Sequence, residues 1–325
     1  GQSAFNITLQ EDTQALDELI VIGYGVVKKS DLTGSVSSVK SSELTAIPQS
    51  TIAQTLQGRA AGIHVKQTSG APGSATTIRI RGINSILGGN DPLYVIDGFP
   101  SYSSNIGMLN VADIESIEIL KDASAIAIYG SRGSNGVIMI TTKKGKAGKT
   151  KVDFGTTMGY QSLTKKMEMM DTKEYTTFYN KYGLIEGVGE YFTESQINSF
   201  GEGFDWQDFV FTTAPIRTHS LTVSGGNEDT KFAVSGNIFD QQGIVGKGSF
   251  SRYSLRTNLD HSISKRLKMN FFSTLSRNID DNKTSQGGRQ GGTLISGALL
   301  SPPILTPYND DGTYRVLDNS YPVIS

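Results

Sequence analysis

The residue types that most often carry out catalysis or hold metals are scarce in this chain. It contains no cysteine and three histidines, His64, His219 and His261, which lie far apart in the sequence. Thiol chemistry and a disulfide framework are therefore excluded, and the histidines lack the spacing of zinc ligands. We predict no cofactor, no metal site and no catalytic residues, so the chain is not expected to be an enzyme.

Two glycine-rich segments resemble phosphate-binding loops without meeting their requirements. Residues 145–150 (GKAGKT) end like such a loop, but Lys143 occupies the position of its first glycine and a strand follows where a helix is required. Gly130, Gly133 and Gly136 have the wrong spacing for a dinucleotide-binding motif, and they follow a helix that this motif must precede. We interpret them as a tight helix-to-strand turn.

Several loops contain side chains that suit ligand contacts. The Gly, Asn and Asp residues at 82–91 either touch a ligand or only form turns, and the aromatic residues at 191–211 either stack on sugar rings or anchor a long loop, which we favour. Residues 309–312 (NDDG) offer oxygen ligands for calcium, although an Asp-Gly turn is the commoner meaning. The candidate ligand contacts are Asn84, Asn90, Asp91, Trp206 and Arg289.

Two arginines alternate with isoleucines in a predicted strand. Because Arg79 and Arg81 are two positions apart, both guanidinium groups are expected on the same face of that strand. They could pair with carboxylates of a surrounding wall, such as Asp153 or Asp260. The alternative, a solvated strand face with ordinary ion pairs, is the commoner meaning for either residue alone.

An extended segment at residues 16–25 (LDELIVIGYG) lies between two patterned regions. Such a segment can add as a strand to the edge of a partner's sheet, with backbone hydrogen bonds supplying the grip. The alternative is an interior strand of a soluble domain, and composition alone does not separate the two. The residues of this candidate docking segment are Asp17, Glu18, Leu19, Ile20, Val21, Ile22, Gly23 and Tyr24.

The composition narrows the class of protein. Thirty basic and 31 acidic residues give a formal charge of −1, which lacks the electrostatic footprint of a nucleic-acid-binding protein. No apolar run is long enough for a transmembrane helix. The 37 glycines, 13 tyrosines and 14 phenylalanines suit β-structure with tight turns and aromatic girdles.

Residues 26–148 are predicted to form a compact α/β domain. A helical patch at residues 45–62 is followed by short strands that Gly, Pro, Asn and Asp turns separate. Asp122 is a suitable N-cap for a short helix that Gly130 closes. The predicted strands are residues 77–81, 93–96, 114–120 and 137–142, and the predicted short helix is residues 123–129.

From residue 149 onward the pattern changes to long alternating strands. In residues 151–161, Val152, Phe154, Met158 and Tyr160 share one face, and polar or small residues share the other. The same pattern recurs downstream, so about five strands are expected, each too polar on one face for a sandwich core. The recurrences lie near residues 220–224, 232–238, 253–260 and 267–275.

The connections between these strands alternate between long and short. Membrane barrels have short turns at one rim and long loops at the other, and this alternation fits that plan. The first long loop is predicted to contain helices at residues 172–182 and near 194–200. The long or intermediate connections are residues 162–215, 241–249 and the stretch after 277, and the tight ones are residues 225–230 and 262–266.

Several segments, taken in order, resemble the SusC/RagA-like TonB-dependent outer-membrane receptors. They include LDELIVIGYG, QGRAAGIHV, IRIRGINS, DPLYVIDGFP and IESIEILKDASAIAIYGSRGSNGVIMITTKKG. Two later stretches, HSLTVSGGNEDTKFAVSGNIFDQQGIV and SRYSLRTNLDHSIS, resemble the first barrel strands of that family. Residues 1–10 are similar to the end of the carboxypeptidase-regulatory-like domain that often precedes its plug.

The resemblance implies an α/β plug domain inside an antiparallel transmembrane β-barrel of about 22 strands, of which about five are present in this chain. Because open strand edges are not tolerated in lipid, the chain is expected to be part of a larger protein. The expected organisation is the end of a preceding β-domain at residues 1–12, a TonB box and linker at 13–25, the plug at 26–148, and barrel strands with extracellular loops at 149–325.

The implied function is energised import across the outer membrane, with a periplasmic N-terminus. The implied partners are TonB, a SusD-like surface lipoprotein, outer-membrane lipid and a glycan or peptide ligand, and no nucleic acid is expected. One alternative is a passive outer-membrane binding or adhesion protein whose plug does not move. A second is a soluble enzyme with an all-β module, and the motifs leave the cargo open.

Overall fold

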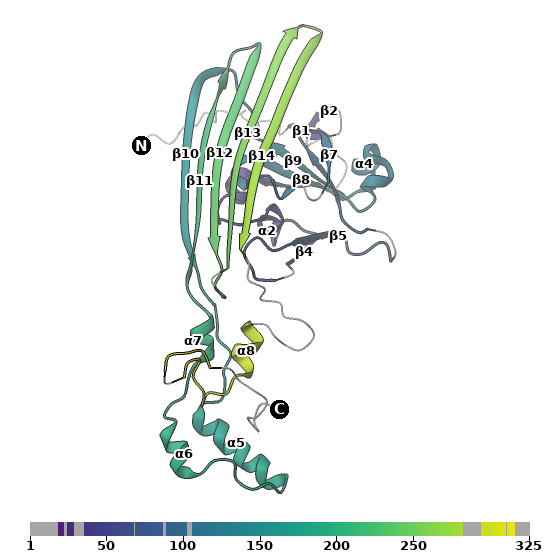
Figure 1. Cartoon of the computed structure of the whole chain (residues 1–325). Coiled ribbons are helices and arrows are strands. Elements are labelled where there is room, and N and C mark those ends of the chain that lie inside the picture. The colour runs from purple at the N-terminus through teal and green to yellow at the C-terminus, as the bar shows by residue number, and fades with distance from the viewer. Residues whose placement is uncertain are drawn as a thin grey trace, which may run out of the picture.

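A computed structural model of the chain shows an α/β domain packed against one long, gently curved sheet (Figure 1). The helices of the long loops lie below both in that view, in teal and yellow. The structure describes residues 19–22, 25–28, 36–67, 69–86, 89–102, 106–246, 248–281, 294–309 and 311–315.

The α/β domain is built on a mixed five-stranded sheet in the order β3-β8-β9-β6-β7. Strands β6 and β9 are parallel, and the other neighbours are antiparallel. A separate hairpin, β4 with β5, packs on the same core. The strands are β3 (Val36–Lys40), β4 (Ile63–Gln67), β5 (Thr76–Ile80), β6 (Leu93–Ile96), β7 (Phe99–Ser101), β8 (Ile114–Leu120) and β9 (Val137–Thr142).

Short helices cover this sheet. Helix α2 begins with a capping box in which the Thr51 side chain accepts from the Gln54 backbone N–H, and the Gln54 side chain accepts in return from the backbone N–H of Thr51. The helices are α1 (Ser41–Leu44), α2 (Ile52–Leu56) and α4 (Ala123–Ile126), with 3-10 segments η2 (Val111–Asp113) and η3 (Ala127–Gly133).

The core of the α/β domain lies on both faces of strand β9. Ile138 and Ile140 point into one apolar cluster, while Val137 and Met139 point into the other, as alternation along a strand requires. A strand that is apolar on both sides is typical of a sheet covered on both faces. The larger cluster includes Val39, Leu44, Ile52, Leu56, Ile78, Ile114, Ile117 and Ile119.

The long sheet is an antiparallel meander in the order β10-β11-β12-β13-β14. Its strands have 13 to 16 residues, more than the roughly 9 to 11 residues that a tilted strand needs to cross a bilayer. They are β10 (Gly148–Gln161), β11 (Ala214–Gly226), β12 (Thr230–Gln242), β13 (Ser249–Ser264) and β14 (Leu267–Asp281). The predicted alternation of these strands is confirmed.

Burial on the long sheet is the reverse of burial in a water-soluble protein. Apolar side chains on its convex face are exposed, with Phe154 at 70% and Leu255 at 47%. Polar side chains on the face toward the α/β domain are buried, with Arg252 at 1% and Asn237 at 3%. A face this apolar and this extensive is expected to contact lipid or another protein.

The connections of the long sheet confirm the predicted alternation. Tight turns join β11 to β12 and β13 to β14, at the top of Figure 1. The long connections at the other end hold α5 (Thr172–Ile185), α6 (Glu194–Ser199), α7 (Trp206–Val210) and α8 (Leu294–Leu300). In the part of the chain that the structure describes, no helix is both long and apolar enough to cross a membrane.

The predicted helix at residues 123–129 is partly wrong. The α-helix ends at Ile126 and continues as a 3-10 segment to Gly133, so Gly130 does not end it. Gly130 instead has a φ of 58° inside that segment, in the region that glycine tolerates best. Strands β3, β4 and β7 and helix α7 have too few residues to show a clear period and were not predicted.

Candidate functional site

The α/β domain is attached to the long sheet by a buried ion pair. Arg256 on β13 places Nη2 at 2.6 Å from Oδ2 of Asp97, which follows β6, and the two side chains are 5% and 4% exposed. Thr142 at the end of β9 completes the group, because its backbone N–H and its hydroxyl donate to Asp97 at 2.9 and 2.8 Å. Arg256 also donates to the Thr142 hydroxyl at 2.9 Å.

The backbone at Asp97 is itself unusual. Asp97 has a φ of 50°, in the left-handed region, where Asp and Asn are the commonest residues after glycine. Its backbone N–H donates to the carbonyl of Ile140 at 2.9 Å, which fixes the turn between β6 and β7 against β9. The segment DPLYVIDGFP therefore ends in a turn that aims a carboxylate at the long sheet.

A second carboxylate is held by uncharged donors. Asp113 is 3% exposed, and its Oδ1 accepts from the Ser235 hydroxyl at 2.6 Å. The Asn237 amide donates to Asp113 Oδ1 and Oδ2 at 3.0 and 2.9 Å. Both donors lie on β12, two positions apart, so they leave the same face of that strand.

Two further side chains of β13 complete these contacts. Arg252 donates to the carbonyl of Ser50 at 2.9 Å and lies over the ring of Phe239, with its guanidinium carbon 5.5 Å from the ring centre. Asn258 donates to the Lys143 carbonyl at 2.8 Å. We call the whole group the interface cluster: Asp97, Asp113 and Thr142 on the α/β domain, with Ser235, Asn237, Arg252, Arg256 and Asn258 on the sheet.

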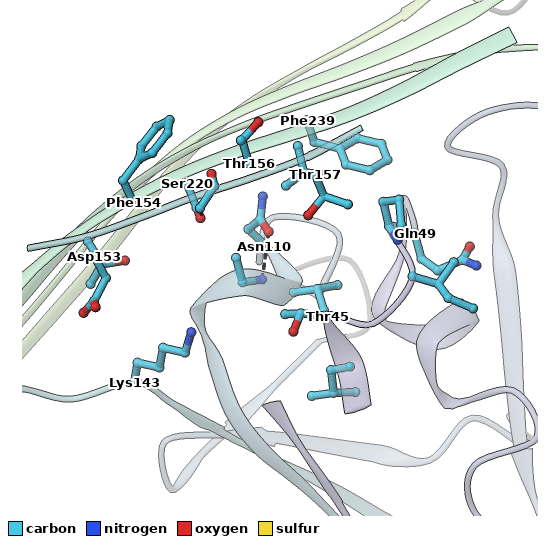
Figure 2. Close-up of a pocket in the computed structure, with 18 residues that line it drawn as sticks. Thr45, Gln49, Asn110, Lys143, Asp153, Phe154, Thr156, Thr157, Ser220 and Phe239 are labelled. Atoms are coloured by element: carbon cyan, nitrogen blue, oxygen red, sulfur yellow. Dashed lines mark hydrogen bonds between the residues drawn. The ribbon is translucent and has the colours of Figure 1, made fainter. Parts of the chain in front are cut away.

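A cavity separates the α/β domain from the neighbouring strands β10 and β11. Its volume is about 330 Å³, and Figure 2 shows Asn110 below Thr156 and Ser220 with its amide pointing toward the strands. Asn110 is 2% exposed, and its Nδ2 has no hydrogen-bond partner. Hydroxyl and amide groups line one part of it, and apolar side chains line the rest. The polar residues are Thr45, Gln49, Asn110, Thr156, Thr157, Thr218, Ser220 and Thr222, with Lys143 and Asp153 at one end, and the apolar ones include Leu44, Ile47, Pro48, Val111, Phe154 and Phe239.

Burial also perturbs two titratable groups of the α/β domain. Desolvation raises the pKa of Tyr94 above its usual range, with the Asp91 carboxylate as a second cause. Desolvation lowers the pKa of Lys121, and the nearby Arg81 adds to this effect. The Lys121 ammonium donates to the Ser37 hydroxyl at 2.7 Å and to the Ala61 carbonyl, so it joins β8 to β3 and to the segment before β4.

The prediction for Arg79 and Arg81 requires correction. Arg79 pairs with Asp91 and Arg81 pairs with Asp122, and both carboxylates belong to the α/β domain itself. Arg81 also lies beyond the end of β5 with a φ of 57°, so the two arginines do not share a strand face. Asp122 precedes α4 but makes no capping bond, because its carboxylate is turned toward Arg81.

The predicted contact loop at residues 82–91 is closed by its own side chains. Asn90 Oδ1 accepts from the backbone N–H groups of Asn84 and Ser85, both at 2.8 Å. The Asn84 amide contacts Asn135 at 3.4 Å, and Asp91 pairs with Arg79. These bonds are those of a structured turn, and ligand contact at Asn84, Asn90 and Asp91 stays a prediction.

Trp206 fixes the first long loop to the segment after α8. Its indole N–H donates to the Pro302 carbonyl at 2.9 Å, and its ring packs edge-on against Phe204 and Phe209. These contacts support the anchor interpretation. Trp206 also lines a cavity of about 570 Å³ between α5, α7 and α8 with three methionines, Met167, Met169 and Met170. Ligand contact at Trp206 stays a prediction, and Arg289 lies outside the described residues.

The docking segment is described in part. Residues Leu19–Ile22 form β1, which pairs antiparallel with β2, Gly25–Lys28. Asp17, Glu18, Gly23 and Tyr24 lie outside the described residues. At residues 309–312, the Asp311 carboxylate accepts from the Thr313 backbone N–H at 2.9 Å, as in a turn. Within the described ranges no group of three or more His, Asp or Glu could hold a metal.

Comparison with known proteins identifies the α/β domain. The family profile described as "TonB-dependent Receptor Plug Domain" matches residues 28–137. This range contains β3 to β8, η3 and the Asp97 and Asp113 carboxylates of the interface cluster. The α/β domain is a TonB-dependent receptor plug.

Relatives extend the similarity to the long sheet. The TonB-dependent receptor P3 of Formosa agariphila is 42% identical over 99% of this chain, and the TonB-dependent receptor SusC of Bacteroides thetaiotaomicron is 36% identical over 95% of it. The chain covers 32% and 30% of their lengths, about a third of each. The predicted resemblance to the SusC/RagA-like TonB-dependent receptors is therefore confirmed.

A solved structure supports the arrangement of plug and sheet. The RagAB peptide importer in its open-open state superposes with a TM-score of 0.78 at 29% identity, over 94% of this chain and 37% of that one. The predicted fold, a plug domain against antiparallel barrel strands, is confirmed, and the five strands of the long sheet resemble part of a receptor barrel and do not close.

Sequence reasoning missed most of the interface cluster. Ser254, Arg256 and Asn258 were placed on the polar face of one strand, but no partner was assigned to them. The available signal was an arginine on the inward face of a strand whose other face is apolar, since such a charge needs a buried partner. The DG pair of DPLYVIDGFP forms a short turn that carries a carboxylate, so it was the natural candidate for the partner of this arginine.

Proposed function

We propose that the complete protein imports a nutrient across the outer membrane, with the plug inside a barrel and the N-terminal segment in the periplasm. The observation that supports this most is a plug domain held on the polar face of strands whose other face is apolar. In this proposal lipid contacts the apolar face, and the plug closes the lumen until force displaces it. No catalytic residue is required.

The proposed energy source is TonB acting on residues 17–24. A strand that pairs in a hairpin, as Leu19–Ile22 does with Gly25–Lys28, has the geometry needed to pair with a partner's sheet edge instead. Because the pull acts along the chain toward β3, it is transmitted into the plug sheet. The test is deletion of residues 17–24 in the complete protein.

The expected result of that deletion is loss of uptake with surface binding of cargo retained. Unchanged growth on the substrate would contradict energised import and favour a passive binding or adhesion protein. A soluble enzyme, the other alternative, predicts that the complete protein stays in solution without detergent, and fractionation of cells tests this.

The proposed partners at the cell surface are a SusD-like lipoprotein and a glycan or peptide cargo. Of the two cargo classes, peptides are named by a relative, the RagAB peptide importer, and the glycan class follows from the sequence resemblance to the SusC/RagA-like receptors. The cavity beside Trp206 lies among the long-loop helices, where such a lipoprotein would sit. Calorimetry of the neighbouring lipoprotein against a panel of oligosaccharides and peptides would distinguish the classes.

A further inference from the structure

The side-chain bonds that hold the plug to the long sheet lie on one side only, although the chain itself passes from β9 to β10 through residues 143–147. All the hydrogen bonds and ion pairs of the interface cluster come from β12 and β13. Strands β10 and β11 make side-chain hydrogen bonds with each other and with β12, such as Thr156 with His219 and Gln241 with Gln161. Among the described residues they make none with the plug.

The unattached side is a cavity rather than a packed contact, and Thr157, Thr218, Ser220 and Thr222 supply hydroxyls on its strand wall. The 330 Å³ volume beside Asn110 is large enough for several water molecules. The Asn110 side chain is 2% exposed, and its Nδ2 has no hydrogen-bond partner. The amide points into the cavity and requires a partner there. Figure 2 shows the hydroxyls of Thr157 and Ser220 around the same space.

This space continues toward the tight-turn end of the sheet. A second cavity, of about 730 Å³, shares Lys143, Asp153 and Thr222 with the first. Its remaining lining is rich in lysine and comes from the segment that joins β9 to β10, the start of β10 and the end of β11, with Ser41 and Glu115 of the plug and Ala233 of β12. Those lysines are Lys144, Lys146, Lys149 and Lys151. Together the two cavities follow the inner face of β10 and β11 from mid-strand to this end.

Separating the plug from β12 and β13 requires more bonds to break than separating it from β10 and β11. Moving the plug away from β12 and β13 breaks the buried ion pair of Arg256 with Asp97 together with the other hydrogen bonds of the interface cluster, and water has to enter before these groups regain partners. Moving it away from β10 and β11 breaks no direct bond between described residues, and polar side chains there are already positioned to contact water. A force on the plug therefore widens the β10–β11 side first.

We propose that cargo passes along the inner face of β10 and β11, through a passage that begins as the cavity beside Asn110, while the interface cluster keeps the plug attached to β12 and β13. This inference rests on the proposed import function. It assigns the lining hydroxyls, Thr157, Thr218, Ser220 and Thr222, to contacts with a hydrated, hydroxyl- or amide-bearing cargo during passage.

The test compares two cysteine substitutions in the complete protein, expressed in cells with its partners and with any other cysteine removed. Ser220→Cys lines the cavity, and Ser254→Cys lies on the inward face of β13, where the Ser254 hydroxyl has no hydrogen-bond partner to lose. Leu221→Cys, on the apolar face, is the control. The probe is fluorescein maleimide added outside the cells, with and without a protonophore.

The expected result is that energised cells label Ser220→Cys more than about tenfold faster than de-energised cells, as a shift from a minor open state requires, while Ser254→Cys and Leu221→Cys do not change. Energy-dependent labelling of Ser254→Cys without Ser220→Cys would overturn the inference. The inference would also be overturned if every variant were labelled at the same rate with and without the protonophore, in cells whose uptake still needs residues 17–24. Uptake that is independent of residues 17–24 would instead overturn the proposed function.

Discussion

The plug and the long sheet bury opposite kinds of side chain. The plug hides isoleucines such as Ile138, which is 0% exposed, whereas the sheet hides Arg252 and Asn237 and presents Phe154 and Leu255 outward. Both regions obey one rule, since each places apolar groups next to an apolar medium. The difference fits the surroundings of the proposed function: water and protein for the plug, and lipid on one face of the sheet.

The interface cluster joins the two regions, so substitutions there are expected to have the largest effect. Replacing Arg256 with Met leaves Asp97 buried without its cation, and we expect a loss of about 3–5 kcal/mol in the stability of the complete protein. Denaturant unfolding in detergent measures this. The exposed pair of Arg79 with Asp91 is the control, because Arg79→Met is expected to cost about 1 kcal/mol or less.

The double variant Asp97→Asn with Arg256→Met separates charge burial from packing. Because it removes both charges, it should be less destabilised than Arg256→Met alone. Equal destabilisation of the two would show that the ion pair does not hold the plug to the sheet.

The next test compares equal truncations in the two regions. Ile138→Ala leaves a cavity in the plug core, and we expect it to cost about 2–5 kcal/mol. Leu255→Ala on the outward face should cost about 1 kcal/mol or less, because lipid tails fill the space and are as apolar as the lost side chain. Similar losses at both sites, measured by the same unfolding assay, would mean that Leu255 packs in a protein core.

A charge on the outward face sharpens the comparison further. Leu255→Arg is expected to destabilise the sheet in a bilayer by about 2–4 kcal/mol. Val188→Arg, at an exposed position of the long loop, should change stability by about 0.5 kcal/mol or less. Folding into lipid vesicles of defined composition measures both variants. A tolerated Leu255→Arg would place this face in water.

The smallest expected effect lies in the plug alone. Thr51→Ala removes the side-chain acceptor of the capping box of α2, and the expected loss is about 1 kcal/mol. Thr51→Ser keeps the acceptor and should restore most of that stability. Thermal unfolding of the complete protein is the measurement, and a neutral Thr51→Ala would show that tertiary contacts alone hold α2.

Sequence periodicity predicted the long sheet well because alternation over 13 or more residues is a strong signal. It also located β6, β8 and β9, whose apolar runs are bounded by turn residues. It missed β3, which has five residues and is defined by pairing with the distant β8, and β7, which has three residues and is a short hairpin arm beside β6.

The site was harder to predict because its bonds join residues far apart in the chain. Arg256 and Asp97 are 159 positions apart, and periodicity gives the face of a side chain but not its partner. For Arg79 and Arg81 the error came from assuming that a single strand continued to Arg81, whereas the backbone turns to a positive φ there. The local carboxylates Asp91 and Asp122 then became their partners.

The central claim is that the outward face of the long sheet lies in lipid while its inward face lies on the plug. Spin labels at Leu255→Cys and Ser254→Cys of the complete protein, in lipid vesicles, test it directly. We predict that the label at 255 collides more with oxygen, which concentrates in lipid, than with a water-soluble nickel complex, and that the label at 254 is immobilised and shielded from both. Dominant collisions of the 255 label with the nickel complex would contradict the account.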